Sequence, residues 1–278
     1  MFNGNTLLNT PLAIDKGYLM SLVPSLAAEF MLMKSTPIQS VKEREMQYLS
    51  KIKKQGEGKE NMKFPVIVDI VGAITKYSTY FSYGTQFLGE LLKELDRSPS
   101  VSGIILNIDS GGGMVSGTAE LTHIIKNLET PTISYTSGYQ CSAALDIASG
   151  CDYHMASPFS DKIGSIGTML SYQDFSAMFE KWGAKIYEIY APQSIEKNKE
   201  YRELMKGNEK LYTEQLKVLA EDFISRMKEN FGEKLKDDGH VFKGKTYTPK
   251  EALEIGLIDE LGSLEAVSYT HLRAHETG

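Results

Sequence analysis

The chain has 278 residues, of which 41% are apolar and 24% charged, so it can bury a core of its own as ordinary soluble proteins do. A net charge of −6 without a long basic block argues against a nucleic-acid-binding protein. Cys141 and Cys151 are too few for a disulfide framework and lack metal-site spacing, which favours a reducing cytoplasm.

The N-terminal residues lack the basic start of a secretion signal. The most apolar early run, 22–33, is interrupted by Pro24 and Glu29 and is too short to span a bilayer, so no membrane anchor is expected. Residues 268–278 do not continue the preceding pattern and resemble translated vector sequence, so we predict a non-native tail that replaces the natural C-terminus.

The N-terminal part is predicted to lie apart from the main domain. Residues 1–50 form a helical arm with helix-like spacing over 16–33 and 40–53. Residues 51–63 are charged and contain two glycines, a composition typical of an exposed linker. Because such a linker cannot bury a core, the arm before it is expected to be peripheral.

Strands and helices alternate from Phe64 onward. The run from Phe64 to Thr75 is β-branched and almost continuously apolar, as in a buried strand, and 83–96 has leucines at helical spacing. The later elements expected are strand 103–108, helix 116–128, strand 132–136, and helices 142–149, 172–182, 201–231 and 249–256. Over residues 64–267 this order predicts an α/β fold with a mainly parallel sheet and flanking helices.

Ser142 follows a strand and a glycine at the start of a predicted helix. Its hydroxyl could cap the helix by accepting a backbone N–H, or it could be a nucleophile favoured by the positive helix end. A serine nucleophile needs a base, and none of the five histidines has a motif around it, so each is expected to be an ordinary surface or core residue. A neutral lysine is the known alternative, and spacing alone leaves Lys197 and Lys199 open.

The glycine run 111–113 directly follows a predicted strand. It could be a simple tight turn, or it could donate backbone N–H groups to an oxyanion and align an extended peptide. A phosphate-binding loop is disfavoured because no Gly-Lys-Ser/Thr sequence follows.

Five segments in this order resemble the signal peptide peptidase A (protease IV) family of serine peptidases, and more narrowly its short phage and prophage members. The segments are Asn107–Gly113, Cys141–Ala148, Lys162–Gly167, Ser194–Asn198 and Val241–Gly262. The resemblance covers about residues 64–267. The chain departs from the family pattern where Gly111 replaces a proline, where Ala143 and Ala144 replace glycines, and where the lysine segment is one residue shorter.

The resemblance implies a Clp-protease/crotonase-like fold, a Ser–Lys dyad and a self-assembling oligomer. Ser142 would be the nucleophile and Lys197 the base, with Lys199 as the alternative. The remaining implied site residues are the oxyanion donors and a hydroxyl that orients the lysine: Gly112 or Gly113, Ala143, and Ser165. Asp146, one helical turn after Ser142, could perturb Lys197, but we expect it to face solvent.

The expected function is that of a serine endopeptidase without metal or cofactor. Its expected substrate is a capsid, portal or scaffold protein, cleaved in the host cytoplasm or the immature virion. Two alternatives remain: a catalytically inactive scaffold protein with the peptidase fold, and an acyl-CoA enzyme of crotonase type. Helix 201–231 carries an apolar stripe that is predicted to pack partly between subunits, formed by Leu211, Leu216, Leu219, Phe223 and Met227.

Overall fold

The structure is a computed structural model, and it describes residues 12–14, 40–59, 62–79, 81–172, 174–183, 185 and 187–265. The predicted helix over 16–33 and the predicted non-native tail over 268–278 lie outside these residues.

A five-stranded sheet in the order β10-β7-β5-β3-β2 forms the centre of the molecule, and all neighbouring strands in it are parallel. Its strands are β2 (Phe64–Val71), β3 (Val101–Asp109), β5 (Thr132–Thr136), β7 (Tyr153–Ala156) and β10 (Glu260–Leu261). Successive side chains of β3 point to opposite faces: Ile104 and Leu106 join the main core, whereas Ile105 joins a smaller cluster. Burial on both faces explains why the sequence of β3 is almost continuously apolar.

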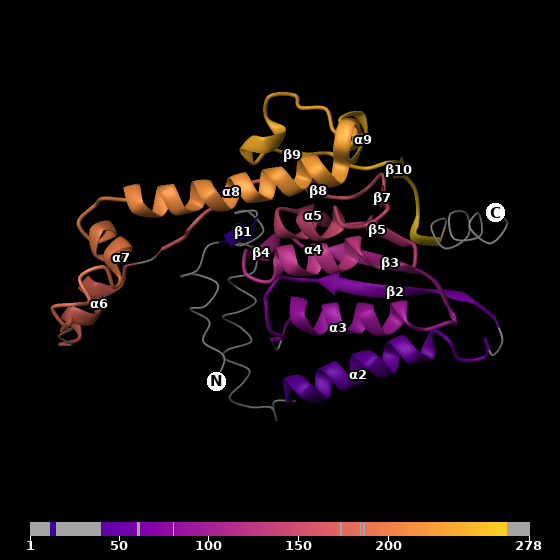
Figure 1. The fold of residues 1–278 in the computed structure, drawn as a ribbon, viewed down its shortest axis with the longest axis horizontal. Helices are drawn as coiled ribbons and strands as arrows, with labels where there is room; N and C mark the ends of the chain where they lie inside the picture. The colour runs from indigo at the N-terminus through magenta and orange to yellow at the C-terminus, as the bar shows by residue number, and fades with distance from the viewer. Residues whose placement is uncertain are drawn as a thin grey trace.

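Three helices connect these strands and lie side by side on the sheet (Figure 1). They are α3 (Thr85–Asp96), α4 (Thr118–Lys126) and α5 (Ala143–Ala148). Leu88 and Leu92 of α3 and Leu121 of α4 are fully buried in the main core. The predicted α/β fold with a mainly parallel sheet and flanking helices is confirmed.

Helix α2 (Val41–Lys54) covers the outer edge of β2, the last strand of the sheet. The Tyr48 hydroxyl accepts from the amide of Asp69 at 2.7 Å, and the Gln55 carboxamide exchanges two hydrogen bonds with the backbone of Ile67 at 2.8 and 2.9 Å. Tyr48 and Ile52 are 5% exposed. The expectation of a peripheral arm is therefore wrong for α2, which crosses the predicted boundary between arm and linker.

Short strands lie beyond the carboxyl ends of the main strands. β6 (Tyr139–Cys141), β8 (Lys162–Gly164) and β9 (Thr246–Tyr247) form a three-stranded sheet. β4 (Gly112–Met114) follows β3 and pairs antiparallel with β1 (Leu12–Ile14). Ligands of parallel α/β sheets bind at this end of the strands, and the glycine run and Ser142 lie here.

The C-terminal half forms an extension and a cover over the sheet. Its helices are α6 (Ser176–Lys181), α7 (Lys199–Leu204), α8 (Lys210–Phe231) and α9 (Pro249–Glu254), with short 3₁₀ turns η2 (Gly232–Lys234) and η3 (Val241–Lys243). The single helix expected over 201–231 is thus two helices, separated where Gly207 adopts φ +82°. Only the second half of α8 packs on the core: Phe223 and Met227 are buried, whereas Leu211, Leu216 and Leu219 are half-buried.

His154 of β7 is a core residue, as expected for a histidine without a motif. It is 1% exposed, its Nδ1 lies 3.0 Å from the Ser134 hydroxyl, and its ring packs on Phe231. Burial, with a smaller effect of the Lys234 charge, lowers the pKa of His154 from its ordinary value of 6.5 to about 4.

This pKa predicts a pH-dependent stability. Below pH 6.5 the unfolded chain binds a proton at His154 that the folded chain rejects, so the free energy of unfolding should fall by about 3 kcal/mol between pH 6.5 and 4. Above pH 6.5 this contribution is constant. Urea unfolding at a series of pH values measures it, and His154→Gln should lose this part of the pH dependence whatever its stability at pH 7. An identical pH dependence in both proteins would contradict the assignment.

Candidate active site

Ser142 occupies a sharp turn between β6 and α5. Its backbone has φ 56° and ψ −120°, a conformation that side-chain-bearing residues rarely adopt. Such strain persists only where the surrounding structure enforces it, and it clusters at functional sites. The side chain makes no capping hydrogen bond to α5, so the helix-cap alternative for Ser142 is wrong. Its Oγ instead donates to the Gly167 carbonyl over 3.4 Å, which is long for a hydroxyl hydrogen bond.

The glycine run lies directly beside the strand that leads to Ser142. The backbone carbonyl of Ser110 accepts from the Cys141 amide at 3.1 Å, and the Ser110 amide donates to the Tyr139 carbonyl at 2.8 Å. These two hydrogen bonds join the start of the glycine run to β6. Gly113 packs so closely on Ile74 that a Cβ would lie only 2.0 Å from the Ile74 carbonyl oxygen. The run is therefore a fixed, closely packed element, and Gly112 and Gly113 are both buried.

Two further predicted site residues lie at the same turn. Ala143, the first residue of α5, is fully buried. The Ser142 amide donates to the Gly164 carbonyl at 2.7 Å, which places Ser165 next to the Ser142 turn. Ser165 also has a left-handed φ of 57°, so two serines without glycine's conformational freedom adopt this region within one site. The structure thus brings together Gly112, Gly113, Ser142, Ala143 and Ser165.

Lys197 is not brought to this group within one chain. It lies two residues before α7, on the extension that carries α6 and α7, and its side chain is exposed. Figure 1 shows α6 and α7 beyond the N-terminal end of α8, away from α5. The alternative base, Lys199, pairs with Glu196 at 2.7 Å. Among the described residues, neither lysine makes a hydrogen bond or ion pair with Ser142.

Asp146 does not face solvent as expected. It is 2% exposed and pairs with Arg226 of α8 at 2.7 Å, and the Thr122 hydroxyl donates to it at 3.3 Å. Burial raises the pKa of Asp146, and the Arg226 hydrogen bond and charge partly oppose that rise. Arg226 holds α5, and therefore the Ser142 turn, against α8. Sequence analysis missed this partner because Arg226 follows Asp146 by 80 residues without any shared motif.

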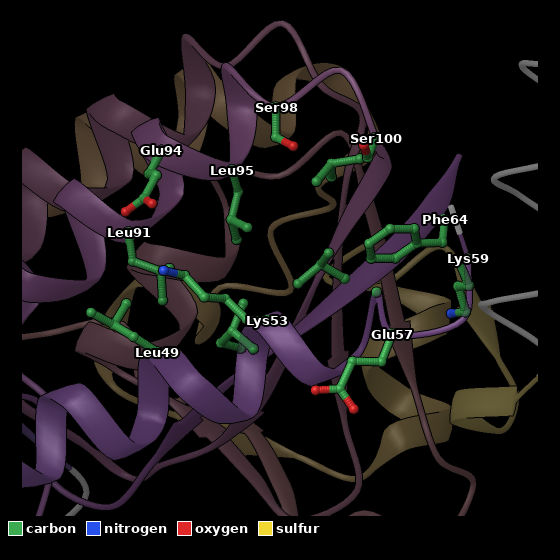
Figure 2. Close-up of a pocket in the computed structure, with 14 residues that line it drawn as sticks. Leu49, Lys53, Glu57, Lys59, Phe64, Leu91, Glu94, Leu95, Ser98 and Ser100 are labelled. Carbon is green, nitrogen blue, oxygen red and sulfur yellow. The ribbon is translucent and has the colours of Figure 1, made fainter. Parts of the chain in front are cut away.

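A cavity of about 470 Å³ lies elsewhere, between α2, α3 and the first residues of β2 and β3 (Figure 2). Leu49, Leu91 and Leu95 line it, with Glu57 and Glu94 beside them. Since Ser142 and the glycine run follow the opposite, carboxyl ends of the strands, this cavity is not part of the candidate active site.

The described part of the chain contains no group of three or more His, Cys, Asp or Glu side chains that could hold a metal ion. Within the same residues, no helix combines the length and apolarity that crossing a bilayer requires.

The sheet order and the position of the site define an α/β protein with its candidate active site at the carboxyl ends of a parallel sheet. Residues 125–275 match peptidase family S49, and the chain belongs to this family. The resemblance to signal peptide peptidase A is thereby confirmed. The match extends into the tail that was predicted to be non-native.

Three relatives are similar to this chain over part of its length. The chain is 26% identical to capsid assembly protease C of Escherichia phage lambda, over 64% of this chain and 40% of the relative. It is 28% identical to an Enterococcus faecium protein named as a signal peptide peptidase SppA, over 75% and 62%. It is 31% identical to the head-tail preconnector protein GP5 of Enterobacteria phage P21, over 36% and 20%. The chain therefore spans less than two thirds of each relative.

Three solved structures have a similar course of the chain. One is a mutant of the 1510-N membrane-bound stomatin-specific protease, with 18% identity and a TM-score of 0.49, and the match covers 74% of this chain and 83% of the other. ClpP1 of Listeria monocytogenes follows with 14% identity, a TM-score of 0.46 and coverage of 71% and 91%. An enoyl-CoA hydratase of Shewanella pealeana has 10% identity, a TM-score of 0.45 and coverage of 77% and 70%.

Proposed function

We propose that the protein is a serine endopeptidase with Ser142 as its nucleophile. The observation that carries this proposal is the strained backbone of Ser142 between a strand and a helix, with a hydroxyl that does not cap the helix. A sharp strand-to-helix turn is a known way to present a nucleophilic serine. Membership of peptidase family S49 supports the same reaction class.

In the proposed reaction, the Ser142 Oγ attacks the carbonyl carbon of the scissile peptide bond while a base takes its proton. The carbonyl oxygen becomes negative and needs nearby N–H donors. Ala143 follows the nucleophile directly and is one donor. The Gly112 amide already donates to the Ser110 hydroxyl at 3.1 Å, so Gly113 is the better second donor. The C–N bond then breaks, the amine leaves with the proton held by the base, and water hydrolyses the acyl-enzyme.

The proposed base is Lys197 of a neighbouring copy of the chain. Within one chain Lys197 is exposed and lies two residues before α7, and Figure 1 shows α7 away from α5, the helix that follows Ser142. The same extension exposes large apolar side chains, with Trp182 at 72% and Ile189 at 94%. Surfaces of this kind mark protein contacts, and docking would also bury Lys197, which favours the neutral amine that a base requires. Ser165, beside the nucleophile turn, could then orient this lysine.

Mixing two inactive variants tests the origin of the base. Ser142→Ala and Lys197→Ala should each abolish peptide cleavage. Their co-expression should restore about a quarter of the wild-type activity. Each site would take Ser142 from one copy and Lys197 from its neighbour, and random assembly makes both residues intact in about one site of four. Lys199→Ala should keep most of the activity. If the co-expressed pair stays inactive although mass spectrometry finds both variants in one oligomer, the base does not come from a neighbouring copy.

The proposed substrate class is a phage structural protein, such as a capsid, portal or scaffold protein, cleaved in the host cytoplasm or immature virion. This rests on the names of the lambda and P21 relatives. The alternative is an inactive scaffold protein that keeps the fold, which the exposed extension would also suit. A fluorophosphonate probe separates the two, because only an activated Ser142 becomes covalently labelled.

A further inference from the structure

A segment from the N-terminal arm lies on the edge of the glycine run. Strand β1 pairs antiparallel with β4 in the register Leu12–Met114, Ala13–Gly113 and Ile14–Gly112. The glycine run is the element that we expected from the sequence to align an extended peptide substrate, and a strand added to such an edge is a common mode of peptide recognition. Sequence analysis placed the arm at the periphery and missed this contact.

The hydrogen bonds of β4 identify which of its groups face β1. The Met114 amide donates to Ile74 at 2.9 Å, and the Ile74 amide donates to Gly112 at 3.0 Å. Since backbone groups of successive strand residues point to alternate edges, the N–H and C=O of Gly113 face the other edge. There the register places Ala13 opposite Gly113.

We propose that residues 12–14 are an intramolecular inhibitor that occupies the substrate edge at Gly113. This proposal rests on the proposed function, because it concerns the same site. The proposal holds for both possible roles of Gly113, alignment of the substrate strand and donation to the oxyanion. Both roles need the N–H of Gly113, and Ala13 lies opposite that group. Burial agrees with an occupied site: Ser142 is only 1% exposed, although an incoming peptide carbonyl must reach its Oγ.

The covalent link makes this occupant a strong competitor. Helix α2 is fixed on the edge of β2 by the hydrogen bonds of Tyr48 and Gln55, and β1 belongs to the same chain. A tethered segment acts at an effective concentration on the order of millimolar, so a free peptide of similar affinity competes poorly below that concentration. Pairing over three residues is short enough for a longer substrate strand to displace it.

Ala13→Pro in the full chain tests the proposal, because proline removes the N–H that faces Gly113 and disfavours pairing. Ala13→Ser keeps that N–H and is the matched control. Two readouts are needed: amide hydrogen exchange over residues 112–114, and kcat/KM for a short peptide substrate. We expect Ala13→Pro to speed the exchange and to raise kcat/KM at least about threefold, whereas Ala13→Ser changes neither.

Exchange that is equally fast in wild type and Ala13→Pro would overturn the proposal, because β1 would not protect β4. Faster exchange with unchanged kcat/KM would overturn the inhibitory role. If neither the wild type nor the two variants cleave the peptide, the proposed function fails. Equilibrium binding of the same peptide then tests whether residues 12–14 occupy its binding site. Tighter binding to Ala13→Pro than to wild type supports it, and equal binding overturns it.

Discussion

Ser142→Ala should lower kcat/KM for peptide cleavage by at least about a thousandfold, because loss of a nucleophile leaves only the catalysis supplied by binding and oxyanion stabilisation. The substitution removes a single oxygen atom whose hydrogen bond to the Gly167 carbonyl is long at 3.4 Å. The melting temperature and the oligomeric state should therefore stay close to those of the wild type. Hydrolysis of a fluorogenic peptide and thermal unfolding measure the two expectations.

Ser100→Ala is the matched control, since Ser100 is exposed and precedes β3 at the opposite end of the strands. It should retain wild-type kcat/KM. Full activity in Ser142→Ala would eliminate Ser142 as the nucleophile. A fluorophosphonate adduct mapped to another serine would identify the residue that replaces it.

Arg226→Met is expected to destabilise the fold by about 3 to 5 kcal/mol at neutral pH, because it leaves a buried carboxylate without its charged partner. Asp146 is 2% exposed, and Thr122 would be its remaining side-chain partner among the described residues. Urea unfolding measures the loss. Lys217→Met is the control on the same helix, where the ion pair with Glu221 at 3.7 Å is exposed and should matter little.

The loss in Arg226→Met should shrink as the pH falls. Without Arg226, burial is opposed only by the weaker effect of the Thr122 hydrogen bond, so the folded-state pKa of Asp146 stays above that of the unfolded chain. Stability from a carboxyl with a raised pKa is present below the unfolded pKa and is lost as the pH rises through the folded pKa. The double variant Asp146→Asn/Arg226→Met removes the buried charge and should recover part of the stability. A loss independent of pH would contradict this account.

The central sheet was predictable because its signals are local. The apolar run of β3 follows from burial on both faces of a parallel sheet. The helical spacing of leucines in α3 follows from burial of the one helix face that packs on the core. Helix α2 was assigned to the periphery because the charged stretch 51–63 was interpreted as a linker. The first residues of that stretch instead form the last turn of a helix that buries Ile52 and pairs Lys51 with Asp69 of β2 at 2.7 Å. Charge on one face of a helix does not indicate what the other face contacts.

The candidate site was predictable only in part, for a related reason. Ser142 and the glycine run lie next to strands that the pattern had already located, so their proximity follows from the topology. The partner of Asp146 depends on how α8 crosses α5, which no spacing in the sequence encodes. The position of Lys197 depends on contacts outside the single chain under our proposal, and a sequence pattern alone contains no distance between two copies.

The side chains of Tyr48 and Gln55 also have a consequence for aggregation. An uncovered terminal strand offers a row of backbone groups to any other extended chain and is a common starting point for edge-to-edge association. On β2 the backbone groups of Ile67 and Asp69 are already occupied from within the molecule. One end of the sheet is thereby closed to growth, so copies of this protein can meet at high local concentration without extending one another's sheets through β2.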